Sequence, residues 1–320
     1  MREYIGRGDF TWFVGVVEDR NDPVQLGRVR VRAYGWHNES LDAIPTNELP
    51  WAIPVNGVSS ASVSGFGNSP TGLFEGSWVI GFFADGERAQ EPMILGSLAG
   101  IPTNLADTAL GFNDPNGKYP TEVNIPDVNK LARGENTKVH ELDTTIPEPA
   151  APYAAVYPYN HVYESESGHT KEYDDTPDAE RIRERHKSGT FYEVHPNGDR
   201  VTHIVNNNYT IVASNNDVHI KGVCNLFIDQ DCNTTIGGDW NINVTGDKNE
   251  TIGGEVVETY SKSKTTKITD NIVESVGGSV TEDYTGSQKT SAASMDINLS
   301  LIHISEPTRQ AEISYAVFCL

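Results

Sequence analysis

The chain has 320 residues, a formal net charge of −21 and 37% hydrophobic residues. Its length allows two domains, and its acidity makes nucleic acid and anionic membranes poor partners. It contains no apolar run of about 18 residues, the length that spans a membrane, and its first residues lack the apolar core of a signal peptide.

Residues 1–102 are predicted to form a compact β-rich domain. Extended patterns separated by turn signals occupy residues 10–18, 27–34, 51–55, 78–83 and 92–98. Five strands without a helical period favour a small barrel or sandwich. The second strand alternates an apolar face with an arginine face that we expect to point outward, formed by Arg28, Arg30 and Arg32.

Several short motifs of this domain occur in an order that resembles one protein family. They are residues 26–32, Gly35-Trp36-His37, Pro50-Trp51-Ala52, Asp85-Gly86 and residues 90–96. Together they resemble the N-terminal OB-fold domain of the central spike proteins of T-even-type phage baseplates. The resemblance implies that the domain packs against a baseplate hub protein, with Arg28, Arg30 and Arg32 as candidate contacts. A solvated strand face explains these arginines equally well.

Residues 103–152 are predicted to be a proline-rich linker. In the T-even spike a lysozyme domain is inserted at this point, between the OB fold and the β-helix. About 50 residues are too few for such a domain. We therefore expect a lysozyme-less variant that is not an enzyme.

Residues 153–200 form a neck whose motifs are similar to the start of the triple-stranded β-helix in phage spikes and in type VI secretion spikes. Its densest titratable cluster comprises His161, Glu164, Glu166, His169, Glu172, Asp174, Asp175 and His186. The spacing of Glu166 and Asp175 resembles that of the phage lysozyme carboxylates, but no lysozyme-like helical pattern surrounds them. We expect salt bridges at strand corners instead.

Residues 201–300 carry an unbroken repeat of eight residues. Every eighth position from Ile204 to Tyr284 is apolar, which chance would produce about once in 10⁴ sequences of this composition. We assign to the interior of a β-helix the aliphatic members Ile204, Val212, Ile220, Ile228, Ile236, Val244, Ile252, Ile268 and Val276.

A second column lies two residues after the first and is rich in glycine. We predict that its glycines form the corners of the β-helix: Gly222, Gly238, Gly246, Gly254, Gly278 and Gly286. No proline occurs between Pro196 and Pro307, as expected where a hydrogen-bonded ladder needs every N–H. Eight extended residues span only about 26 Å, too little for one chain to wind around an interior. The pattern favours three intertwined chains over a single-chain solenoid or a disordered tract.

Other residues of the repeat suggest weaker sites. His195, His203 and His219 share one phase that could bind a metal across a three-fold axis, but we expect them to face solvent and predict no metal and no cofactor. Cys224 and Cys232 are expected to be buried or half-buried thiols. One even phase could line a hydrated interior, with Lys248, Lys264, Glu250, Glu258, Glu274 and Glu282.

Residues 301–320 lose the repeat and resemble a translated sequencing adapter, so we expect an aberrant tail rather than a genuine C-terminal cap. The overall prediction is an all-β homotrimer with an N-terminal OB-fold barrel, a linker and a C-terminal intertwined triple-stranded β-helix.

The resemblance implies a structural central spike in the tail baseplate of the virion, which pierces the host outer membrane on sheath contraction. Its implied partners are the hub protein and, on an intact β-helix, a PAAR-type tip protein. The alternatives are a type VI or related injection spike and, from other classes, a cell-wall hydrolase or a trimeric adhesin.

Overall fold

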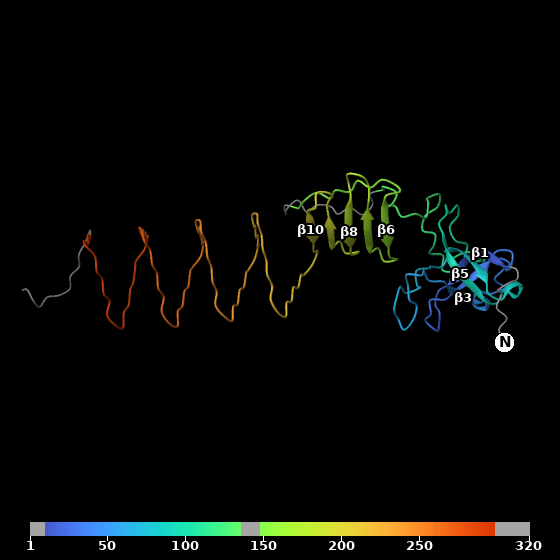
Figure 1. Cartoon of the computed structure of the whole chain (residues 1–320), viewed down its shortest axis with the longest axis horizontal. Coiled ribbons are helices and arrows are strands. Elements are labelled where there is room, and N and C mark those ends of the chain that lie inside the picture. The colour runs from blue at the N-terminus through green and yellow to red at the C-terminus, as the bar shows by residue number, and fades with distance from the viewer. Residues whose placement is uncertain (1–9, 136–147, 298–320) are drawn as a thin grey trace, which may run out of the picture. The chain divides into compact units, whose positions relative to one another are not determined.

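The computed structural model describes residues 10–135 and 148–297. It separates into two units, Met1–Lys221 and Gly222–Leu320 (Figure 1). The fold is all-β, as predicted: strands and two 3₁₀ helices, η1 (Thr46–Glu48) and η2 (Gly86–Arg88), are its regular elements, and no α-helix occurs in the described residues. These residues also contain no helix of the length and apolarity that a membrane crossing requires.

The first five strands close into a barrel in the order β1-β2-β3-β5-β4. They are β1 (Trp12–Asp19), β2 (Val29–Ala33), β3 (Trp51–Pro54), β4 (Trp78–Phe83) and β5 (Pro92–Leu98). The β3–β5 pair is parallel and the others are antiparallel. Alternate side chains fill the core, among them Phe13, Val17, Val31, Val79 and Ile94. This is the barrel arrangement that the strand pattern predicts.

Close packing explains one glycine of this barrel. A Cβ placed on Gly81 would lie 2.1 Å from the Met93 carbonyl oxygen and 2.6 Å from the Phe13 ring. Strand β4 can approach β5 and the core only because this position lacks a side chain.

The prediction that the arginine face of β2 points into solvent is wrong for Arg32. Its side chain is fully buried and pairs with Glu18, with Nε 2.6 Å from Oε1 and Nη2 3.1 Å from Oε2. Its guanidinium also donates to the carbonyl oxygens of Asn38 and Ile44. Residues 111–112 cover it, because Gly111 leaves room for the guanidinium and the Phe112 N–H donates to Glu18.

The described part of the predicted linker is folded. Phe112 stacks on Tyr34 with ring centroids 4.0 Å apart, and Tyr119 stacks on Phe74 at 5.5 Å. The buried carboxylate of Asp114 accepts the backbone N–H groups of residues 116, 118 and 119. Side-chain and turn contacts thus hold this segment without a strand of its own.

A second, antiparallel sheet follows, with its five strands in sequence order. They are β6 (Asn160–Glu164), β7 (Thr170–Asp174), β8 (Arg181–Arg185), β9 (Phe191–Val194) and β10 (Arg200–His203). We call this the neck sheet.

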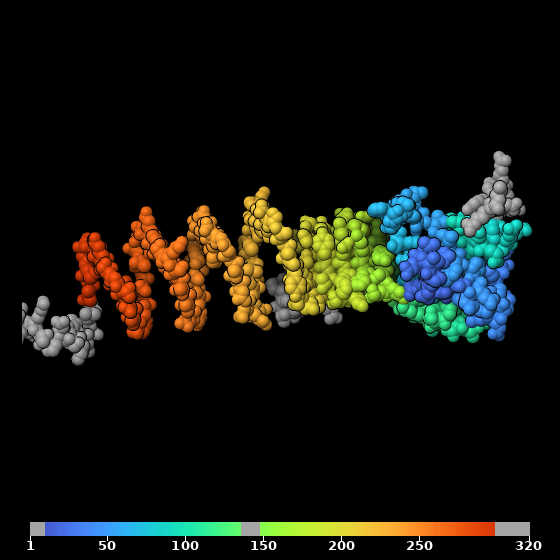
Figure 2. All heavy atoms as spheres, turned by 90° about the horizontal axis from the view of Figure 1, so that it is seen from below, coloured from blue at the N-terminus to red at the C-terminus, as the bar shows by residue number. Residues whose placement is uncertain are grey.

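Residues 222–297 form a succession of extended stretches and bends, drawn in orange to red in Figure 1. No strand or bridge is formed within described residues 204–297. In the space-filling view, open space separates successive turns of this segment, which we call the coil (Figure 2). Its backbone N–H and C=O groups therefore lack ladder partners in the described chain.

Replacing Arg32 with Met should destabilise the barrel by about 3–5 kcal/mol, because Glu18 would stay buried without its partner. Lys130 forms an exposed ion pair with Glu122 at 2.9 Å, and Lys130→Met should cost less than about 1 kcal/mol. Urea unfolding followed by tryptophan fluorescence checks both, since four of the five tryptophans lie in residues 12–78. Equal effects of the two substitutions would contradict the role of the buried pair.

Candidate functional site

The apolar column is the least exposed set of large apolar side chains in the coil. From residue 222 onward its exposed fractions run from 44% at Ile236 to 51% at Ile252, whereas other large apolar residues range from 58% at Val256 to 91% at Val273. The column residues Ile228, Ile236, Val244, Ile252, Ile268 and Val276 each directly precede a bend, so the turning backbone shields one side of them. In the first unit, Val212 and Ile220 have exposures of 48% and 52%.

The bends fall on the predicted glycine column. Each predicted corner glycine is the second residue of a bend: Gly222, Gly238, Gly246, Gly254, Gly278 and Gly286. A Cβ added at any of them would meet nothing within 4 Å. Within one chain, therefore, no described atom requires glycine at the corners, and their role stays a prediction.

The polar contacts of the coil join only residues of even number. Lys248 Nζ lies 2.6 Å from Glu250 Oε2, Lys264 pairs with Glu258, and Tyr284 and Gln288 donate to Glu282 at 2.9 and 3.4 Å. The apolar column has the same parity. Even-numbered side chains of the described coil therefore share one side of the backbone, as expected for alternating extended residues.

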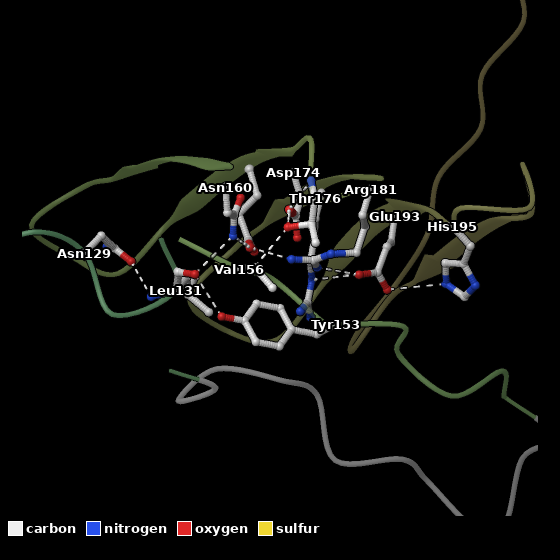
Figure 3. Close-up of polar contacts among 12 residues, drawn as sticks. Asn129, Leu131, Tyr153, Val156, Asn160, Asp174, Thr176, Arg181, Glu193 and His195 are labelled. Atoms are coloured by element: carbon white, nitrogen blue, oxygen red, sulfur yellow. Dashed lines mark hydrogen bonds and ion pairs between the residues drawn. The ribbon is translucent and has the colours of Figure 1, made fainter. Parts of the chain in front are cut away.

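The densest polar site lies on the buried face of the neck sheet (Figure 3). Arg181 of β8 donates to Glu193 Oε1 at 2.7 Å and to Glu172 Oε2 at 2.6 Å. All three side chains are at most 1% exposed. Antiparallel pairing creates this arrangement, because β8 lies between β7 and β9 and each strand directs alternate residues to this face.

The side chains of Asn160 and Tyr153 and the backbone carbonyl of Leu131 complete this network. Asn160 Nδ2 donates to Glu172 Oε2 at 3.1 Å and to the Leu131 carbonyl at 3.2 Å. The Tyr153 hydroxyl donates to the same carbonyl at 2.8 Å, and its ring lies 5.0 Å from the Arg181 guanidinium. The network thus holds Leu131 and Tyr153 against the neck sheet.

The two carboxylates stabilise the buried charge of Arg181. Burial lowers the pKa of Arg181, but Glu172 and Glu193 more than offset that effect, so its pKa is raised. Burial and the nearby Glu172 raise the pKa of Tyr153 to about 12. Arg183 is buried beside Phe191, 4.7 Å from the ring centroid, and desolvation lowers its pKa.

The expectation of salt bridges at strand corners is wrong for Glu172 and Asp174 of the predicted cluster, whereas Glu166, between β6 and β7, does form salt bridges. Glu172 and Arg183 lie at the centres of β7 and β8, and Asp174 is buried at the end of β7. In the sequence, the alternating Arg181-Ile182-Arg183 pattern was the signal that two arginines share one face of the strand. It was missed because charges on one strand face are usually exposed.

Glu166 lies at a second ionic centre, which we call the hairpin clamp. Oε1 of Glu166 accepts from Arg20 at 3.1 Å, from the Tyr119 hydroxyl at 2.9 Å and from Lys118. Arg20 also pairs with Glu75 at 3.1 Å. The clamp thereby joins Glu166, in the β6–β7 turn, to three other segments. These are Arg20 after β1, Glu75 before β4, and Lys118 and Tyr119 after β5.

The hairpin clamp gives Glu166 the opposite of the environment that a general acid needs. Hydrogen bonds from Arg20, Lys118 and Tyr119 lower the pKa of Glu166 to about 2, whereas a glycosidase acid needs a raised pKa to keep its proton. Asp175, its predicted partner by spacing, is exposed and lies 3.5 Å from His161.

The three histidines that could have shared a metal ion have different surroundings. His195 lies 3.5 Å from Glu193 and His203 lies 3.2 Å from Glu148, whereas His219 is exposed. The described residues contain no group of three or more metal-ligating side chains. Cys224 and Cys232 are exposed in the single chain, contrary to the expectation of buried or half-buried thiols.

Arg28, which directly precedes β2, and Arg30 of β2 also form contacts within the chain. Arg28 Nη2 lies 2.7 Å from Asp22 Oδ1, and Arg30 donates to the Leu49 carbonyl and lies over the Trp51 ring at 4.5 Å. Both keep a partly exposed side chain. Of the three hub-contact candidates, only Arg28 and Arg30 can thus reach another molecule.

Replacing Glu166 with Gln should lower the melting temperature at pH 7. The carboxylate has a lowered folded-state pKa, so its contribution is present above its ordinary pKa of 4.5 and is lost as the pH falls toward about 2. The difference between the two proteins should therefore vanish near pH 2. Asp175→Asn, which alters an exposed pair, is the control and should change little. A pH-independent effect of Glu166→Gln would contradict the clamp.

Comparisons with known proteins agree with the barrel and the neck. Residues 35–185 match the family described as the Gp5 N-terminal OB domain. The chain is 42% identical over 267 residues to "Protein Gp5" of Vibrio phage KVP40, covering 68% of this chain and 63% of that protein. It is also 42% identical over 131 residues to the "Pre-baseplate central spike protein Gp5" of Enterobacteria phage T4, covering 39% and 22%.

The chain therefore spans 63% and 22% of the lengths of these two relatives. The family match begins after β2 and covers β3, β4 and β5 of the barrel and β6, β7 and β8 of the neck sheet. The predicted resemblance of this chain to the central spike proteins of T-even-type phage baseplates is confirmed.

Proposed function

We propose that the chain is the structural central spike of a contractile phage tail baseplate and that it has no lysozyme activity of its own. Its similarity to a protein named as a pre-baseplate central spike supports the location in the virion. The observation that carries the mechanical role is the coil, whose regular apolar column finds no partner in its own chain.

Three copies of the chain would supply the missing partners. The chain exposes 26603 Å², whereas a compact monomer of 35.0 kDa exposes about 13,000 Å² by the usual scaling with mass. Other copies wound into the open space between the turns (Figure 2) would pair the backbone groups and cover the half-exposed column. A trimer of this kind also explains glycine at the corners, where neighbouring backbones would approach.

Stiffness follows from this arrangement. In an intertwined β-helix each backbone group is bonded to another chain, so that no chain can bend or leave alone. We infer that contraction of the sheath drives the spike into the host outer membrane and that the β-helix carries the axial load. In the barrel and neck, the hairpin clamp and the Arg181 network would resist shear between the folded parts.

The absence of lysozyme activity is proposed from the carboxylates. Glu166 is held ionised by three donors, and Glu172 and Glu193 are bound to Arg181. A glycosidase acid must be accessible to the substrate and able to hold a proton, whereas Glu172 and Glu193 are buried and the pKa of Glu166 is lowered.

The proposed partners follow from the relatives. We propose that the barrel attaches the trimer to a baseplate hub protein, with Arg28 and Arg30 as candidate contacts. We also propose a PAAR-type tip protein at the end of an intact β-helix. A type VI or related injection spike would use the same mechanics in another machine.

The trimer should appear in light scattering after size exclusion at about 105 kDa, three times 35.0 kDa. Ile236→Asp should abolish it, because three unpaired carboxylates would be buried near one axis at several kcal/mol each. Val273→Asp is the matched control: it has odd parity and 91% exposure, and it should still assemble. A monomeric wild-type protein, or an Ile236→Asp variant that is still trimeric, would contradict the assignment of the apolar column to the interior of a trimer.

Purified protein should release no soluble fragments from peptidoglycan. The measurement is the turbidity of a cell-wall suspension over time, with a known muramidase as positive control. Release of muropeptides that persists in Glu166→Gln would show a catalytic site elsewhere, and release lost in that variant would show that Glu166 acts as an acid.

A further inference from the structure

The neck sheet has an inverted distribution of side chains. Its buried face carries charged residues, including Glu172, Arg181, Arg183 and Glu193. Its other face carries two exposed rows, each formed by residues paired across all five strands. The rows are His161, Tyr173, Ile182, Val194 and Arg200, and Tyr163, Lys171, Glu184, Tyr192 and Thr202.

These two rows, which we call the tyrosine face, expose large apolar and aromatic surfaces. The exposed fractions are 69% at Tyr163, 47% at Tyr173 and 40% at Ile182, while Tyr192 and Val194 are half-buried. Clustered exposed aromatic residues on one sheet face mark interaction surfaces. Tyrosine suits such a face, because its ring is apolar and its hydroxyl remains able to hydrogen-bond.

Charge on the tyrosine face is low compared with the rest of the chain. The rows contain two positive groups, Lys171 and Arg200, and one negative group, Glu184, a net charge of +1 in a chain of −21. Lys171 pairs with Glu184 at 2.8 Å, and Arg200 lies 5.0 Å from the centroid of the Tyr192 ring. Copies of an acidic chain repel one another elsewhere, so a nearly neutral face is where they can approach most closely.

The residues of the tyrosine face in β10 have the same even numbering as the apolar column that follows them. In β10, Arg200 and Thr202 belong to the two rows, since they pair with Val194 and Tyr192. Ile204 is the next residue of that parity and begins the column. Alternation of an extended chain therefore directs Ile204 and the tyrosine face to the same side.

We propose that the tyrosine face of the neck sheet binds other copies of this chain and begins the inner surface of the trimer. This inference rests on the proposed trimeric spike and names the surface through which its neck assembles. The buried face already has an intrachain cover, in which residues 131 and 153–160 join the Arg181 network. The tyrosine face is therefore the one left for a partner.

The experiment places a photoreactive benzoylphenylalanine at Tyr173 of the full chain and irradiates the purified protein. The control carries it at Phe66, which is 72% exposed in the loop between β3 and β4. Denaturing gels should show cross-linked dimers and trimers from position 173 and monomers from position 66. Light scattering on the same samples reports the oligomeric state.

A second pair of variants tests the energetics. Ile182→Glu should lower the temperature at which the trimer dissociates, and Leu95→Glu, at a barrel position of 53% exposure, should leave it unchanged. A trimer with no cross-links from position 173, or with equal cross-links from 66, would overturn the tyrosine face while leaving the proposed function intact. A monomer in light scattering would overturn both.

Discussion

The structure of the C-terminal part depends on one unmet requirement, the pairing of backbone hydrogen-bonding groups. Residues 204–297 are extended, yet the described chain forms no ladder there. Extended backbone cannot be buried without partners, and the apolar column cannot stay half-exposed at no cost. The proposed association with further copies would meet both requirements at once, and the eight-residue spacing would keep every turn equivalent for such pairing.

The barrel and neck are held differently, by buried charge pairs within the chain. Arg32 with Glu18 and Arg181 with Glu172 and Glu193 join neighbouring strands. Buried ion pairs contribute little net stability compared with apolar packing, but removal of one partner is costly. Their geometric demands fix the register between the strands that they join.

The ion pairs also limit the chemistry of the carboxylates that take part in them. A carboxylate bound to arginine is a poor general acid, because the arginine stabilises its charged form. Glu166 shows this most clearly, since three donors lower its pKa to about 2. The buried carboxylates of the neck therefore serve to position its strands, and the similarity to a protein named as a central spike agrees with the proposed structural role.

The sequence by itself determined the five barrel strands, the eight-residue period and its bends, because local alternation and glycine placement act over a few residues. Only the tertiary structure decided the position of Arg32, which alternation directs away from the core and which Glu18 and residues 111–112 then bury. It also decided that Arg181 and Glu193 are buried and that Glu166 is clamped. Those outcomes depend on segments far apart in the chain meeting in space, and no local pattern of residues contains that information.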